Sequence, residues 1–134
     1  MEYAIGVILG IVVCPFASLV GFDKERGFYP VVLIVIEGYY LLFAAMAKST
    51  DALLTEVFPL LLFTVAAVLG FRRTLWIAAA GLALHGAFDA IRHTVIHNPG
   101  VPEWWPGFCL SIDVAMAGYL AVLILVRAKS TTNG

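Results

Sequence analysis

The chain has 134 residues, of which 62% are hydrophobic and 13% are charged, and its formal net charge is −1. Soluble domains carry about 45–50% apolar and about 25% charged residues, so this composition predicts a single domain embedded in a lipid bilayer. The near-zero net charge excludes a basic surface for nucleic acid, and the same composition excludes a disordered chain and a disulfide scaffold.

Five apolar segments are long enough to cross a membrane, which requires about 20 mainly apolar residues. They lie at residues 4–20, 28–47, 52–70, 74–93 and 107–126. The polar breaks between them are short, so each helix is expected to run antiparallel to the one before it. The predicted fold is an all-α integral membrane bundle of five transmembrane helices, forming one domain over residues 1–134.

The distribution of Lys and Arg predicts the orientation of this bundle, because cytoplasmic connections carry an excess of both. Six of the eight basic residues fall in the first connection, the third connection and the C-terminal segment. The other two, Lys48 and Arg92, fall on the opposite side. We therefore expect the N-terminus outside and the C-terminus inside.

The fourth and fifth segments carry polar residues that suit a metal ion. His85, Asp89 and His93 recur at i, i+4 and i+8, so they share one face of a helix. Asp113 lies about two turns into the fifth segment, at the depth that His85 and Asp89 reach on an antiparallel neighbour. Imidazole and carboxylate groups are transition-metal ligands, and bundles build such sites from facing helices. The pattern predicts a site for Zn, Fe, Mn or Cu with ligands His85, Asp89, His93 and Asp113.

Two other interpretations of the intramembrane acids stay open. An ionised side chain at the bilayer centre costs ~2.5–3.5 kcal/mol, so an acid there must be protonated, paired, metal-bound or hydrated. Four acids are concerned: Glu37, Glu56, Asp89 and Asp113. They can form a proton relay or an ion pathway. In a purely structural interpretation, Arg92 neutralises Asp89 at i+3.

Glu37 and Glu56 are assigned no firm role. Glu37 is followed by Tyr39 and Tyr40, so a tyrosine hydroxyl can satisfy it as a neutral acid. Glu56 lies about one turn from the outer end of its segment and is expected to be solvated. His97 precedes Asn-Pro and is expected to belong to a loop.

A longer pattern begins with His85-Gly86-x-x-Asp89 and continues with Asn98-Pro99-Gly100-Val101-Pro102-x-Trp104-Trp105-Pro106-x-Phe108-Cys109-Leu110-x-x-Asp113. This pattern resembles that of a family of small uncharacterised bacterial multi-span membrane proteins, and Gly21–Asp23 and Phe28–Pro30 extend the likeness over most of the chain. The resemblance implies a multi-pass protein of the bacterial inner membrane and carries no activity.

The leading hypothesis is an inner-membrane protein that binds a metal between its fourth and fifth helices and acts on a lipophilic substrate. For an enzyme of this kind, the reaction class is metal-assisted hydrolysis or oxidation, with Asp89 or Asp113 as base or ligand. The alternatives are a proton-conducting, ion-conducting or transport subunit and an accessory subunit of a larger complex. Besides the bilayer, the partners expected are further copies of the chain or other subunits.

Overall fold

Five α-helices and one 3-10 turn make up the part of the chain that the computed structural model describes, residues 1–133. In chain order they are α1 (Glu2–Val20), η1 (Phe22–Lys24), α2 (Phe28–Met46), α3 (Thr50–Arg72), α4 (Leu75–Val95) and α5 (Trp105–Asn133). No strand occurs among these residues. The all-α class and the number of helices are therefore confirmed, and α5 continues beyond the predicted segment 107–126.

Local sequence signals set several helix boundaries. Gly21 ends α1 with a left-handed φ of 96°, which glycine adopts without steric cost, and its N–H donates to the carbonyl of Ala17. At the start of α3, the Ser49 side chain accepts a hydrogen bond from the backbone N–H of Ala52. Thr74 plays the same part at the start of α4.

Four of the five helices, α1, α2, α3 and α5, are long and apolar enough to cross a membrane. The exception, α4, is long enough at 21 residues but falls short in composition. Its second half carries His85, Asp89 and Arg92, which lower the mean hydropathy of the helix. Composition alone therefore supports four of the five predicted spans.

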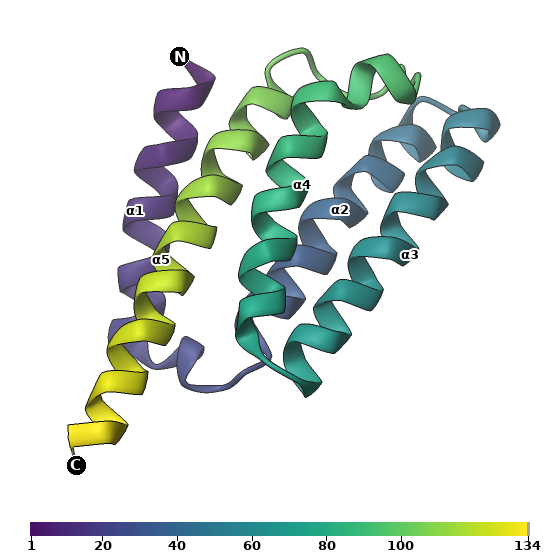
Figure 1. Ribbon diagram of the computed structural model, residues 1–134. Helices are drawn as coiled ribbons and strands as arrows, with labels where there is room; N and C mark the ends of the chain where they lie inside the picture. Colours follow the sequence, from purple (N-terminus) through teal and green to yellow (C-terminus); the bar gives the residue numbers. More distant parts are fainter. Residues whose placement is uncertain (134) are drawn as a thin grey trace.

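The helices form a bundle in which one face of α4 packs against α2, α3 and α5, while its other face is exposed (Figure 1). α4 packs against α3 and α5 and also contacts α2, while α5 lies between α1 and α4. Met1, the α2–α3 turn and the α4–α5 loop lie at one end, which we call the N-terminal end of the bundle. Large apolar side chains cover the outside; Leu19 and Phe58, for example, are 87% and 73% exposed.

Small residues allow the close approach of α4 and α5. A Cβ atom on Gly86 would lie 3.2 Å from the Cβ of Asp113 and 3.2 Å from the carbonyl oxygen of Leu110. Glycine at this position therefore allows the backbone of α5 to bring Asp113 against the polar face of α4.

Candidate metal centre

The polar side chains of α4 face the interior of the bundle. His85, Asp89 and Arg92 follow one another at i, i+4 and i+7, so they lie on one face of the helix. His85 and Asp89 are fully buried, and Arg92 is 3% exposed. Because α4 is surrounded by α2, α3 and α5, this face meets acids that come from all three neighbours.

Three of the four predicted metal ligands come together. The candidate ligand atoms of His85, Asp89 and Asp113 all lie within 4.8 Å of one another, and all three residues are buried. His85 Nδ1 lies 2.6 Å from Asp113 Oδ2 and 3.4 Å from Asp89 Oδ2. This group, which we call the buried triad, joins α4 to α5 and can hold a metal ion.

The fourth predicted ligand, His93, lies outside the triad. It is exposed near the end of α4, where it lines a surface pocket together with His97. Eight residues along an α-helix add about 80° of rotation beyond two full turns, so His93 has turned away from the face of His85. His97 follows α4 in the loop, as the sequence indicates.

Arg92 connects three acids from three helices. Its Nη2 donates to Glu37 Oε2 at 2.5 Å, its Nη1 donates to Glu56, and its Nε donates to Asp89 Oδ1 at 3.2 Å. The guanidinium carbon also lies 3.5 Å from the centre of the Tyr40 ring, a cation–π contact. The pairing of Arg92 with Asp89 expected in the structural interpretation is thus present, and two further acids share it.

The expectations for Glu37 and Glu56 were wrong, because both acids are fully buried partners of Arg92. Glu37 Oε2 also lies 2.7 Å from His85 Nε2, whereas the Tyr40 hydroxyl has no hydrogen-bond partner among the described residues. Glu56 is held by the loop after α4, since Asn98 Nδ2 donates to Glu56 Oε1 at 3.0 Å. The sequence signals for this network were Arg92 and the two acids themselves, each an ionisable residue inside a mainly apolar segment.

The buried triad together with Arg92, Glu37 and Glu56, which we call the buried cluster, contains more negative than positive groups. Glu37, Glu56, Asp89 and Asp113 face Arg92 and a single histidine. With all four acids ionised, the surplus is three negative charges for a neutral imidazole and two for a protonated one. Three of the carboxylate oxygens have no hydrogen-bond partner among the described residues: Glu37 Oε1, Asp89 Oδ2 and Asp113 Oδ1. Bound protons or a bound cation must compensate this charge, because an uncompensated buried charge is strongly unfavourable.

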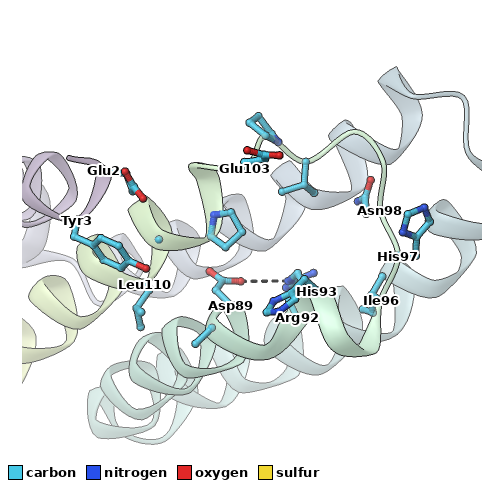
Figure 2. A pocket seen from close by; sticks show the side chains of 15 residues that line it. Glu2, Tyr3, Asp89, Arg92, His93, Ile96, His97, Asn98, Glu103 and Leu110 are labelled. Atoms are coloured by element: carbon cyan, nitrogen blue, oxygen red, sulfur yellow. Dashed lines mark hydrogen bonds and ion pairs between the residues drawn. The ribbon is translucent and has the colours of Figure 1, made fainter.

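A pocket of about 460 Å³ lies at the N-terminal end of the bundle (Figure 2). Exposed residues, among them His93, His97 and Glu103, form part of its lining. Two members of the buried cluster, Asp89 and Arg92, also line it. The pocket therefore leads from the protein surface to the edge of the cluster.

Comparison with known proteins adds no assignment: no protein-family model, no curated protein and no solved structure matches this chain. Function is therefore inferred from the chemistry of the buried residues.

Proposed function

We propose that this protein is a small multi-pass protein of the bacterial inner membrane that binds a divalent transition metal, Zn, Fe, Mn or Cu, in the buried triad. One observation carries the proposal: an imidazole nitrogen and carboxylate oxygens from two helices converge within 4.8 Å in the protein interior. Neutral imidazole and carboxylate are ligands for each of these metals.

The surroundings of His85 suit a metal ligand. Metal-bound histidines commonly donate their second ring N–H to a carboxylate, which fixes the tautomer and the orientation of the ring. Glu37 Oε2 lies 2.7 Å from His85 Nε2 and can accept that hydrogen bond. Nδ1, on the other side of the ring, then directs its lone pair toward Asp89 and Asp113.

A divalent cation also suits the charge of the cluster. It would compensate two of the surplus negative charges and supply a partner for the free oxygens of Asp89 and Asp113. Arg92 already compensates part of the charge of Glu37, Glu56 and Asp89. The triad is therefore the part of the cluster with the greatest need of a cation.

An apolar cavity beside the cluster supports a lipophilic substrate. It measures about 660 Å³, lies between α3 and α4, and is lined by residues that include Leu62, Phe63 and Phe88. The Phe63 ring packs against His85 at a centroid distance of 4.9 Å, and Phe88 packs against Arg92. A bound metal would supply Lewis acidity or redox chemistry beside this cavity, with Asp89 and Asp113 as ligands or base.

A proton relay is the second candidate, and a continuous chain of contacts favours it. The chain of titratable groups runs from Asp113 through His85 to Glu37. Arg92 keeps its protons and holds Glu37 and Glu56 in place. In this alternative, protons rather than a metal compensate the surplus charge. Such a series of contacts suits a subunit that conducts protons or ions or takes part in transport.

Elemental analysis of the protein purified in mild detergent separates the two candidates. The metal proposal predicts about one equivalent of a transition metal per chain, lost in Asp113→Asn, which keeps the shape of the side chain but weakens a ligand. The matched control is His97→Ala, which alters a histidine outside the triad and should keep the metal. A protein that stays metal-free after titration with each of the four metals would overturn the metal proposal and leave the relay.

A further inference from the structure

Asp89 belongs to both the buried triad and the lining of the pocket at the N-terminal end. Its Oδ1 accepts from Arg92, whereas its Oδ2 has no hydrogen-bond partner within residues 1–133 and lies 3.4 Å from His85 Nδ1. The other two members of the triad, His85 and Asp113, do not line the pocket. A single carboxylate therefore connects the pocket with the triad.

Away from the pocket, protein encloses the triad, with apolar side chains toward α1 and α3 and Glu37 on the side of α2. The cavity between α3 and α4 and the groove between α1 and α5 are lined almost entirely by apolar side chains, and neither lining includes a triad member. The rings of Phe63 and Tyr40 pack on His85. A hydrated cation would have to lose its water against hydrocarbon on these sides, which is strongly unfavourable.

The charges of the pocket favour a cation. The charge of Arg92 is shared by three carboxylates, and Glu2 lies 3.4 Å from the N-terminal ammonium group. Glu103 is exposed on the lining and forms no ion pair among the described residues. An acid-lined concavity raises the local concentration of cations. About 460 Å³ is ample for an ion with its first water shell, since a water molecule occupies about 30 Å³ in the liquid.

We infer that this pocket is the access route by which a hydrated divalent cation reaches the buried triad, and that Asp89 receives the ion from the pocket. The inference rests on the proposed metal site. Glu103 attracts the ion at the surface, and the free Oδ2 of Asp89 replaces its first water molecules. His85 and Asp113 then complete the coordination.

A reversible block of the pocket tests this route. Ala90 is exposed and lines the pocket, and the two natural cysteines are buried, so a thiol introduced by Ala90→Cys can be labelled selectively with a bulky, charged methanethiosulfonate. In the labelled protein we expect metal loading to be slower by roughly tenfold or more, because the ion must wait for fluctuations of the bundle. The final occupancy should be unchanged. Reduction, followed by removal of the reductant, should restore the rate.

Thr94→Cys is the matched control, since Thr94 is exposed one turn further along α4 and does not line the pocket. Its labelled form should load metal at the wild-type rate. Glu103→Gln is a second variant that needs no label, and we expect slower loading, by ~2–10-fold at low salt.

The outcomes distinguish the access route from the metal site itself. If the unlabelled protein binds metal and the labelled Ala90→Cys variant loads as fast as the labelled control, the route is overturned and the metal site stands. Failure of the charged reagent to reach the thiol at position 90 would also overturn the route. Absence of metal binding in the wild-type protein would overturn the proposed site and the route together.

Discussion

The guanidinium group of Arg92 pairs with three carboxylates, one each from α2, α3 and α4. Its guanidinium carbon lies 3.5 Å from the centre of the Tyr40 ring and 4.6 Å from the centre of the Phe88 ring. The guanidinium group is planar and has five N–H donors, so it can bond to three acids at once. The ammonium group of lysine is a compact charge with three donors and is less suited to this arrangement. This residue therefore connects three helices through one side chain.

Removal of this charge should strongly destabilise the protein. We expect Arg92→Leu to lower the free energy of unfolding by about 3–5 kcal/mol, because Glu37, Glu56 and Asp89 lose the guanidinium group that pairs with them. Arg92→Lys should recover part of the loss. The measurement is denaturant unfolding in detergent micelles, with Arg72→Leu, at an exposed position, as a control that should stay within about 0.5 kcal/mol of wild type. Equal stability of Arg92→Leu and the control would mean that the acids are neutral in the native protein.

At the scale of elements, close contacts between helices depend on small residues. A Cβ atom on Gly6 of α1 would lie 2.6 Å from the backbone oxygen of Phe108 and 1.9 Å from Ser111 Oγ, both on α5. The two helices must therefore move apart to accept any larger residue at this position. A Cβ atom on Gly118, also on α5, would meet no atom of the described residues within 4 Å.

These two glycines should respond to alanine in opposite ways. Gly6→Ala should lower the free energy of unfolding by roughly 1–3 kcal/mol, because the backbone of α5 must shift. Gly118→Ala should raise it by about 0.5–1 kcal/mol, since alanine restricts the unfolded chain and favours the helix. Both effects can be measured in the same micelle unfolding assay. A loss of stability in Gly118→Ala, or none in Gly6→Ala, would contradict this packing of α1 on α5.

At the scale of the whole molecule, the surface is unusually apolar and the interior unusually polar. Exposed leucine, isoleucine, valine and phenylalanine side chains cover α1 and α3, while the buried cluster lies inside the bundle. An apolar surface of this extent suits contact with lipid or with another protein. The interior polar groups face other protein groups, and Asp89 and Arg92 also line the pocket at the N-terminal end.

The orientation of the molecule can be tested with reporter fusions. The excess of Lys and Arg at the end opposite to Met1 predicts a cytoplasmic C-terminus, because positive residues are retained on that side. A reporter fused after Gly134 should be active in the cytoplasm of a bacterial host, and one inserted at Pro99–Gly100 should be active in the periplasm. Inverted activities would place the pocket on the cytoplasmic side and overturn the proposed orientation.

The five helices and their order along the chain can be predicted from the residues alone, because length and hydropathy are local properties of each segment. The sequence also determined that Asp113 meets His85, since a short loop makes α4 and α5 antiparallel neighbours and residue spacing then sets the depth of each side chain. The segment composition further indicated that the four acids had to be protonated, paired, metal-bound or hydrated.

Which residues surround His85 and Asp113 depends on how the helices pack together. Apart from Glu37 and Glu56, apolar residues lie on all sides of α2 and α3, so hydrophobic periodicity does not indicate which face turns toward α4. The burial of the two acids depends on that rotation. The loop after α4 contacts Glu56 through Asn98, although these two residues are 42 positions apart in the chain. His93 is not part of the triad, because eight residues of α-helix turn its side chain away from the face that carries His85. Contacts between helices, rather than patterns within them, built the cluster around Arg92.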